Sequence, residues 1–356
     1  MANAVTYGFH RLADVFAERI NTVGIPVITA AIDATLAEHN RQLAAFMNLF
    51  ADRTTDYKRR YKSPVAARLQ PVDEIGRARP IQVAGYYDIA FPMHRGGAAW
   101  GMTYEARVKA TVQDVNNVMT TLLTADARWV RDHIFAALFV ADGWTYTDEQ
   151  WGALTVEGLA NGDSIQYLIQ SGQDTGATDT HLLAQAAAIS DTADPYSTMK
   201  GELLEHPENS GDVVALIPTG LVATTKALTS FVPLPDMNID PGIAAARLVG
   251  SLGATVPGTV IGYHDDGVWI AEWPGMPANY IIATATGGDR ALTMREEPEA
   301  QLQGFTRVAE RDDYPFYESQ YVHKAGFGGQ NRVNALVTRI GNGTYATPAG
   351  YESPLP

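Results

Sequence analysis

The chain has 356 residues, of which 46% are hydrophobic and 19% are charged, a composition typical of folded proteins. It contains no cysteine, which excludes disulfides, thiolate-bound zinc, iron–sulfur clusters and cysteine nucleophiles. Its net charge of −14, divided as +4 in residues 1–110 and −18 in residues 111–356, argues against a protein whose main role is to bind nucleic-acid phosphates. A chain of this length forms about two or three domains.

Targeting and membrane signals are weak in this sequence. Residues 1–20 contain charged side chains where a secretory signal peptide needs an apolar core. The nearest candidate for a membrane span, residues 213–235, contains Lys226 and three prolines, and we interpret it as a strand, a turn and a short helix. We therefore expect no membrane partner.

Residues 1–62 are predicted to form a helical arm that ends in a basic cluster. Apolar residues recur at helical spacing over residues 9–50, and Gly24 and Pro26 divide that pattern into two helices. The basic cluster, residues 52–62, has no defined nucleic-acid-binding motif. It is as compatible with a solvated hinge as with a nucleic-acid contact.

Residues 63–103 are predicted to form an extended two-stranded ribbon. Prolines and glycines punctuate short β-prone runs, and the segment has little core of its own. An isolated ribbon is marginal in water, so we expect this one to lie against another surface. The candidate contact residues within it are Arg68, Asp73, Glu74, Arg77, Arg79, Ile81, Tyr86, Phe91 and Arg95.

Residues 104–141 are predicted to form one long helix, because they contain no Gly or Pro and carry a one-sided apolar stripe. At the helical rise per residue this segment spans roughly 55 Å. The chain then becomes rich in Gly and Thr, with short strand candidates in residues 143–180 and a small helix expected at residues 179–191.

Residues 205–290 alternate strand and helix signals and are predicted to form a compact α/β core. A strand is expected at residues 211–218 and a helix at residues 220–231. A hairpin over residues 259–274 places Asp266-Gly267 at its turn. Residues 291–356 are strand-rich. Four aspartates are expected at exposed tips and are candidates for contacts between subunits: Asp236, Asp240, Asp265 and Asp266.

No catalytic, cofactor or metal site is predicted. The eight histidines show no metal-binding spacing, and the sequence has no GxSxG elbow and no Walker loop. Residues 236–242 place oxygen ligands at alternate positions, but Arg247 stands where a calcium loop needs a bidentate Glu. His264 and the two aspartates that follow it are interpreted as a solvated hairpin tip.

The order of these parts resembles the major capsid protein of tailed bacteriophages, the Hong Kong 97 fold, which belongs to the α+β class. The final stretch, YVHKAGFGGQNRVNALVTRIGNGTYATPAGY at residues 321–351, looks like the closing strands of such proteins. The resemblance covers nearly the whole chain. It implies an N-terminal arm at 1–62, an E-loop at 63–103, a peripheral domain at 104–204 with a spine helix at 104–141, an axial domain at 205–290, and strands at 291–356 that return to the peripheral domain.

The resemblance implies a structural protein without enzymatic activity or cofactor. Such a subunit assembles with copies of itself, in the host cytoplasm, into hexamers and pentamers of an icosahedral shell around phage double-stranded DNA, and ends up in the virion. Scaffold, portal and decoration proteins are the further partners it implies. In some relatives an E-loop lysine forms an isopeptide bond with a neighbour's asparagine, but residues 63–103 contain no lysine. We therefore expect no covalent cross-linking by that route.

Three alternatives remain open at this point. An encapsulin-like nanocompartment shell has the same fold but encloses enzymes in place of DNA. A cytosolic hydrolase with a scattered site would be a monomer or small oligomer with turnover. A tail or baseplate protein would assemble into tubes or rings.

Overall fold

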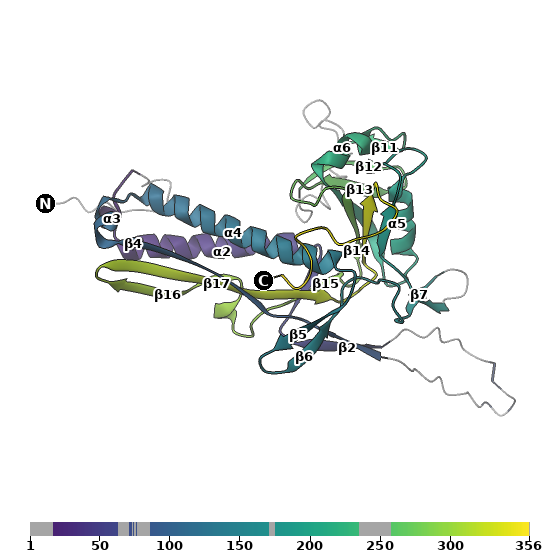
Figure 1. The fold of residues 1–356 in the computed structure, drawn as a ribbon, viewed down its shortest axis with the longest axis horizontal. Coiled ribbons are helices and arrows are strands. Elements are labelled where there is room, and N and C mark those ends of the chain that lie inside the picture. Colours follow the sequence, from purple (N-terminus) through teal and green to yellow (C-terminus); the bar gives the residue numbers. More distant parts are fainter. Residues whose placement is uncertain are drawn as a thin grey trace. The chain divides into compact units, whose positions relative to one another are not determined.

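The structure is a computed structural model that describes residues 17–62, 71, 72, 74, 76, 86–170, 175–234 and 258–355. The chain forms two compact units (Figure 1). The first unit takes in the chain up to Ala44 together with Met93–Asp132 and Glu296–Ala325. The second takes in Ala45–Pro92, His133–Arg295 and the chain from Gly326 onward.

The break predicted at Gly24 and Pro26 is confirmed, but residues 17–19 are not helical and residues 9–16 lie outside the described residues. Helix α1 spans Ile20–Val23 and helix α2 spans Ile25–Met47. Gly24 separates them at a φ of +91°, a conformation that favours glycine, and its N–H caps α1 by donating to the Ile20 carbonyl at 2.9 Å. Pro26 stands in the first turn of α2, where its missing N–H costs no helical hydrogen bond.

The single helix predicted at 104–141 is wrong in its first turns. Helix α3 spans Tyr104–Lys109 and helix α4 spans Val112–Phe139. Between them Thr111 and Asp114 form a reciprocal cap. The Thr111 N–H donates to the Asp114 carboxylate at 2.9 Å, and the Asp114 N–H points to the Thr111 hydroxyl at 3.4 Å. This T-x-x-D cap begins a new helix, which then runs unbroken for 28 residues, or about 42 Å.

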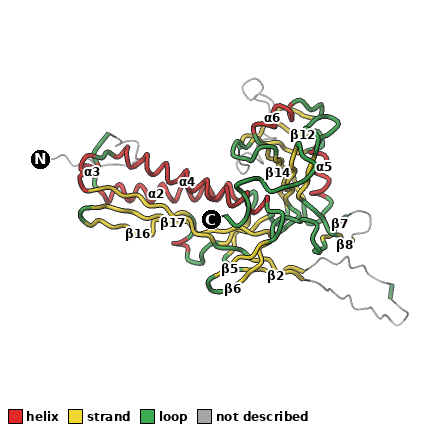
Figure 2. Tube along the Cα trace, viewed as in Figure 1, coloured by secondary structure: helices red, strands yellow, loops and turns green. Residues whose placement is uncertain are grey.

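The first unit places helices on one face of a three-stranded antiparallel sheet (Figures 1 and 2). Strand β17 (Phe316–Gly329) lies between β4 (His94–Thr103) and β16 (Phe305–Asp313). Alternate residues of β4 are half-buried, and Trp100 and Met102 pack against the helices. The predicted ribbon at 63–103 is therefore too long, because its last ten residues belong to this sheet.

The largely apolar core of the first unit contains a buried carboxylate, that of Asp126. Apolar side chains from α2, α4, β16 and β17 form the core. Asp126 of α4 is 5% exposed, and His39 of α2 and His323 of β17 each contact one of its oxygens, at 2.8 and 2.6 Å. Burial alone would raise the pKa of Asp126, but hydrogen bonds from His323 and His39 outweigh it and lower the pKa.

The second unit is built on a seven-stranded mixed sheet. Its strand order is β11-β12-β13-β10-β14-β18-β9, in which the pairs β10–β13 and β18–β9 are parallel. The strands are β9 (Leu182–Gln185), β10 (Ser210–Ile217), β11 (Phe231–Pro233), β12 (Thr259–His264), β13 (Val268–Glu272), β14 (Tyr280–Gly287) and β18 (Ala335–Ile340). Helix α5 (Pro195–Leu204) packs against this sheet, and α6 (Thr219–Lys226) adds Leu221 to the same core.

The predictions for this sheet are confirmed in part. The strand at 211–218, the helix that follows it and the hairpin with its turn at Asp266-Gly267 are all present. The small helix predicted at 179–191 is wrong, because the chain there forms β9, which pairs with β18. The sheet also takes in residues outside 205–290, so the predicted boundaries at 204/205 and 290/291 do not enclose it.

The second unit also contains smaller strand pairs and a short sheet. Strand β15 lies between β1 and the end of β17. The second unit also has three two-stranded pairs, which are β2 with β3, β5 with β6, and β7 with β8. The bounds are β1 Ala51–Thr54, β2 Lys58–Lys62, β3 Tyr86–Ala90, β5 Trp144–Asp148, β6 Gly152–Val156, β7 Tyr167–Ile169, β8 Thr175–Ala177 and β15 Leu292–Arg295. The expected α+β class is confirmed.

Among the described residues no helix has the length and apolar character needed to cross a membrane.

Replacing Asp126 by Asn is expected to destabilise the protein by about 3–5 kcal/mol at about pH 7, because the buried His323 and the half-buried His39 lose their carboxylate. In the wild-type protein the pKa of Asp126 is lower in the folded state than in the unfolded state. The ionised carboxylate of Asp126 therefore contributes to stability above about pH 4, and this contribution is lost as the pH falls through the pKa of the folded state. The difference between wild type and Asp126→Asn should shrink at about pH 3. Urea unfolding followed by fluorescence at both pH values measures it.

The matched control is Asp132→Asn on the same helix, where the carboxylate is 37% exposed and pairs with Arg131. We expect this change to cost less than about 1 kcal/mol. Equal losses for the two variants would contradict the role assigned to Asp126.

Candidate assembly interface

The strands β2 and β3 flank residues 63–85, which belong to the segment predicted to form a ribbon. Lys62 pairs with Tyr86, so residues 63–85 connect the paired ends of the two strands. Tyr86 is 65% exposed, and the guanidinium carbon of Arg60 lies 4.3 Å from its ring centroid. Arg60 also donates two hydrogen bonds to Asp88, at 2.6 and 2.9 Å, and these lower the pKa of Asp88. The base of the segment is thus an exposed aromatic and ionic surface.

The predicted contact residues have different outcomes. Tyr86, Glu74 and Arg95 are exposed, as a contact residue must be. Asp265 and Asp266 are also exposed, with side-chain exposures of 63% and 45%. Seven candidates lie outside the described residues: Arg68, Asp73, Arg77, Arg79, Ile81, Asp236 and Asp240.

Phe91 does not face outward, and its prediction as a contact residue is wrong. Its side chain is fully buried, and its N–H donates to the Tyr57 carbonyl at 2.9 Å. Gly328 lies against it so closely that a Cβ there would come within 3.0 Å of the ring and 2.7 Å of the Ala90 carbonyl. Phe91 therefore anchors the end of β3 to its own unit, and Ile89, also fully buried, does the same.

The β12–β13 turn is acidic, and its residues form contacts with neighbouring side chains. His264, 2% exposed, has its Nε2 2.7 Å from the Asp194 carboxylate, and its Nδ1 accepts from the Asp266 N–H at 3.2 Å. When Nδ1 accepts in this way, the Nε2 proton points to Asp194. Nδ1 also lies 3.2 Å from the Asp265 carboxylate. Ser197 of α5 donates to the Asp266 carboxylate, and the Lys200 ammonium donates to the Asp266 carbonyl. The turn is tied to α5.

A second exposed aromatic surface lies in the first unit, and sequence reasoning missed it. We call it the aromatic tip: Tyr104 at the start of α3, with Tyr314 and Phe316 at the β16–β17 turn. Their exposed fractions are 46%, 85% and 61%. The Tyr104 N–H donates to the Pro315 carbonyl at 2.9 Å, and Arg107 pairs with Asp312 at 2.7 Å, so α3 is fixed to the turn. The signal available in the sequence was the run YPFY between two strand candidates.

Exposed aromatic groups at the end of a hairpin point to a contact with another molecule. Exposed apolar patches on soluble chains commonly mark interaction sites, and aromatic residues are enriched in protein interfaces. The aromatic tip and the Tyr86 surface are therefore two described surfaces with the character of an intermolecular contact.

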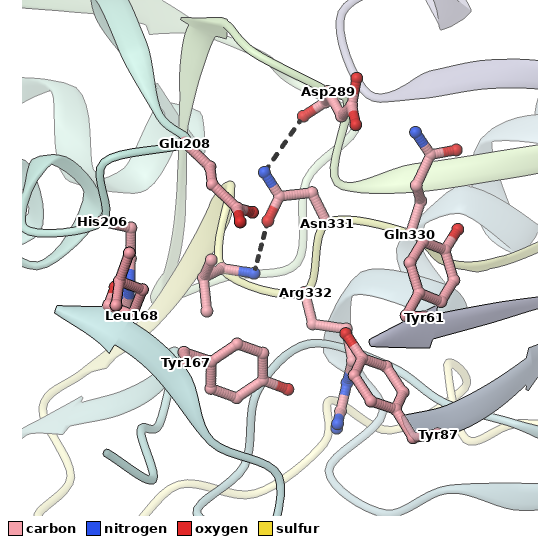
Figure 3. A pocket seen from close by; sticks show the side chains of 11 residues that line it. Tyr61, Tyr87, Tyr167, Leu168, His206, Glu208, Asp289, Gln330, Asn331 and Arg332 are labelled. Atoms are coloured by element: carbon pink, nitrogen blue, oxygen red, sulfur yellow. Dashed lines mark hydrogen bonds between the residues drawn. The ribbon is translucent and has the colours of Figure 1, made fainter. Parts of the chain in front are cut away.

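The second unit contains a polar cavity of about 100 Å³ (Figure 3). Tyr61, Tyr87 and Tyr167 line it together with Arg332. Burial raises the pKa of all three phenols, to about 12 for Tyr87, so they stay protonated at neutral pH. The cavity therefore offers hydrogen-bond donors and no phenolate nucleophile.

Arg332 holds the wall of this cavity together. It is 1% exposed and donates to the Gly158 and Leu159 carbonyls, at 2.7 and 3.0 Å, and to the Asp163 carboxylate at 2.7 Å. Each of these bonds satisfies a group that folding removes from water. The guanidinium is thus committed to structure rather than available to a ligand.

Comparison with known proteins gives a likeness of structure but none of sequence. No protein-family model and no curated protein matches the chain. A solved chain from Mycobacterium phage Patience has 16% sequence identity and a TM-score of 0.68, and the match covers 99% of both chains. At this identity the likeness shows a shared fold, which extends over the whole chain.

Two further solved structures are less similar. The capsid of a native GTA particle matches with 12% identity and a TM-score of 0.47, covering 83% of this chain and 90% of that one. The mature capsid of bacteriophage PhiM1 matches with 8% identity and a TM-score of 0.47, covering 83% and 87%. Likeness at this level carries no argument here.

Replacing Arg332 by Met is expected to lower the free energy of unfolding by about 3–5 kcal/mol, because it leaves two carbonyls and a carboxylate without their partner. Chemical denaturation of the purified subunit measures the loss. The control is Arg60→Met in the same unit, whose guanidinium is 59% exposed. That change should cost much less than Arg332→Met, because water screens an exposed ion pair. A loss for Arg332→Met no larger than for the control would contradict the structural role.

Proposed function

We propose that this chain is the major shell subunit of a tailed-phage capsid. It assembles with copies of itself into hexamers and pentamers that enclose double-stranded DNA, in the host cytoplasm, and it resides in the virion. The observation that carries the proposal is the fold shared over 99% of both chains with a chain from Mycobacterium phage Patience. The order of arm, ribbon, long helix and α/β core in the sequence points to the same family.

The proposal assigns the inter-subunit contacts to two surfaces. Residues 63–85 reach a neighbouring subunit, and their arginines and Ile81 supply charge-assisted and apolar contacts there. Tyr86 and Arg60, exposed at the base of this segment, extend the same contact. The aromatic tip supplies a second contact, because burial of an aromatic side chain at an interface contributes a large apolar area.

The seven-stranded sheet serves, in this proposal, as the axial domain. Identical loops from a ring of subunits meet near the symmetry axis. Asp236, Asp240, Asp265 and Asp266 are assigned to those loops. Repulsion between such carboxylates has to be offset by a nearby hydrogen-bond donor or cation. Ser197 and Lys200, which both donate to Asp266, are groups of this type.

The charge of the chain suits a container wall. Residues 111–356 carry a net charge of −18, so the bulk of the subunit repels DNA and does not adhere to its cargo. The proposal includes no catalysis. The scaffold, portal and decoration proteins of a phage head are its further partners.

Expression of the full chain alone is expected to yield rings or closed shells rather than monomers, since the interfaces belong to the chain itself. Sedimentation velocity and negative-stain electron microscopy measure this. A monomer or small oligomer at all concentrations would contradict a shell function and favour the hydrolase alternative. Protein in place of nuclease-protected DNA inside particles from the native host would favour a nanocompartment.

Replacing residues 63–85 by an Asn-Gly turn is expected to leave a folded, soluble subunit that cannot close a shell. The turn suits the site because Lys62 and Tyr86 are already paired. Circular dichroism checks the fold and microscopy checks assembly. The matched control is Val72→Ser within the segment, a single exposed side chain, which should leave assembly intact. Normal particles from the turn variant would remove the segment from the assembly interface.

Mature particles are expected to contain no covalent cross-links between subunits. Residues 63–103 offer no lysine for an isopeptide bond, and the chain has no cysteine. Particles boiled in detergent should therefore run as a single band near 38.5 kDa on a denaturing gel. A ladder of heavier bands from this chain would show that a lysine elsewhere reacts.

A further inference from the structure

Three titratable side chains of the second unit converge on one buried point. The Nε2 atom of His181 lies 3.0 Å from Asp179 Oδ2, and the Nε2 atom of His206 lies 2.8 Å from the same oxygen. The two Nε2 atoms are 3.1 Å apart. The side chains of His181 and His206 are 0% and 1% exposed, and that of Asp179 is 11% exposed.

The opposite nitrogen of each ring shows where the protons are. His181 Nδ1 lies 2.9 Å from the Ala335 carbonyl, and His206 Nδ1 lies 2.9 Å from the Leu168 carbonyl. A carbonyl oxygen only accepts hydrogen bonds, so both Nδ1 atoms carry a proton. In a neutral imidazole the other nitrogen then presents a lone pair. Two such lone pairs and a carboxylate oxygen therefore face one another.

A metal ion can satisfy all three facing lone pairs, whereas added protons cannot. One added proton serves one Nε2 and leaves the other lone pair against the carboxylate. Two added protons place two imidazolium groups 3.1 Å apart, where like charges repel. A divalent cation accepts all three lone pairs at once.

The other two histidine–aspartate clusters among the described residues do not have this feature. His264 accepts a backbone N–H at Nδ1, which leaves its Nε2 to donate to Asp194. His39 and His323 each face a separate oxygen of Asp126. In the Asp126 cluster each short contact pairs one ring nitrogen with one carboxylate oxygen. In the His264 cluster Nδ1 also lies 3.2 Å from the Asp265 carboxylate, but that side chain is 63% exposed and no second histidine faces it.

We propose that Asp179, His181 and His206 form a binding site for a divalent transition-metal ion, with Zn²⁺ as the best match. Imidazole nitrogen and carboxylate oxygen are ligands that zinc prefers, at about 2.0–2.2 Å. A triangle with edges of 2.8–3.1 Å can hold an ion at about that distance from all three atoms. The carbonyls at both Nδ1 atoms are the outer partners that orient metal-binding histidines.

The remaining position belongs to Glu205 or to water. Glu205 follows α5 directly, and its carboxylate oxygen lies 3.9 Å from His206 Nε2. A metal here ties the segment before β9 to the end of α5. Through the two Nδ1 hydrogen bonds it also supports the start of β18 and strand β7. The site is structural, because its ligands are almost fully enclosed.

The test uses the full-length protein, stripped of metal with a chelator and titrated with Co²⁺ and then with Zn²⁺. The expected result is one ion bound per chain, the intense visible absorption of tetrahedral Co²⁺, and a rise in melting temperature that the chelator reverses. Substoichiometric binding with no rise in melting temperature would overturn the proposal. The measurement concerns the subunit alone and does not depend on whether it assembles.

His206→Asn and His181→Asn locate the ion. Asn keeps a donor near the position of Nδ1, so the bond to the carbonyl is preserved while the Nε2 ligand is lost. Each variant should bind Co²⁺ at least about 10-fold more weakly. The control His264→Asn should bind like wild type. Unchanged binding in both ligand variants overturns the assignment, and if they do not fold, the Co²⁺ spectrum of the wild type decides between nitrogen–oxygen coordination and none.

Discussion

A charged group buried in a protein must have partners, and in each unit those partners come from segments far apart in the chain. In the first unit Asp126 of α4 is held by His39 of α2 and His323 of β17. In the second unit Arg332 reaches back to Gly158 and Asp163. Removing one partner leaves an uncompensated charge or a set of unpaired carbonyls. These contacts therefore tie together segments that are far apart in the sequence.

Several large aromatic side chains stay exposed at the ends of hairpins. Tyr86, Tyr314 and Phe316 are large aromatic side chains that remain mostly exposed in their own units. Folding alone gains nothing from leaving them in water. Association with another copy would cover them and recover that free energy. Exposed aromatic side chains at the ends of hairpins are thus suited to an intermolecular contact.

The polar clusters divide into two kinds once their protons are assigned. In the Asp126 cluster each short contact pairs one ring nitrogen with a separate carboxylate oxygen, and in the His264 cluster a single ring faces Asp194 on one side and an exposed turn on the other. In the cluster of Asp179, His181 and His206 three acceptors face one another. The pair Asp179 and His181, two residues apart, was visible as D-x-H in the sequence. Its partner His206 is 25 residues further on and could be found only in the fold.

Local features of the sequence determined where many elements begin and end. Gly24 ends α1, the Thr111–Asp114 cap starts α4, and Asp266-Gly267 turns a hairpin, because each acts through residues within one turn of itself. The prediction of one helix over 104–141 followed the continuous apolar stripe and did not take account of the T-x-x-D signal at 111–114, which starts a new helix in the structure. The order of parts along the chain was also sufficient to identify the fold, which extends over the whole chain.

Only the tertiary structure decided which strands pair and which side chains are covered. β4 has a ribbon-like sequence, yet it pairs with β17, more than 200 residues away. β9 has a helical composition, yet β18 supplies a parallel partner for its backbone. Phe91 lies in a run with the alternating pattern of an exposed ribbon, yet its side chain is buried, because Gly328 has no side chain to fill that space. Periodicity reports only a residue's neighbours in sequence, whereas strand pairing, burial and the convergence of Asp179, His181 and His206 depend on residues that the fold brings together.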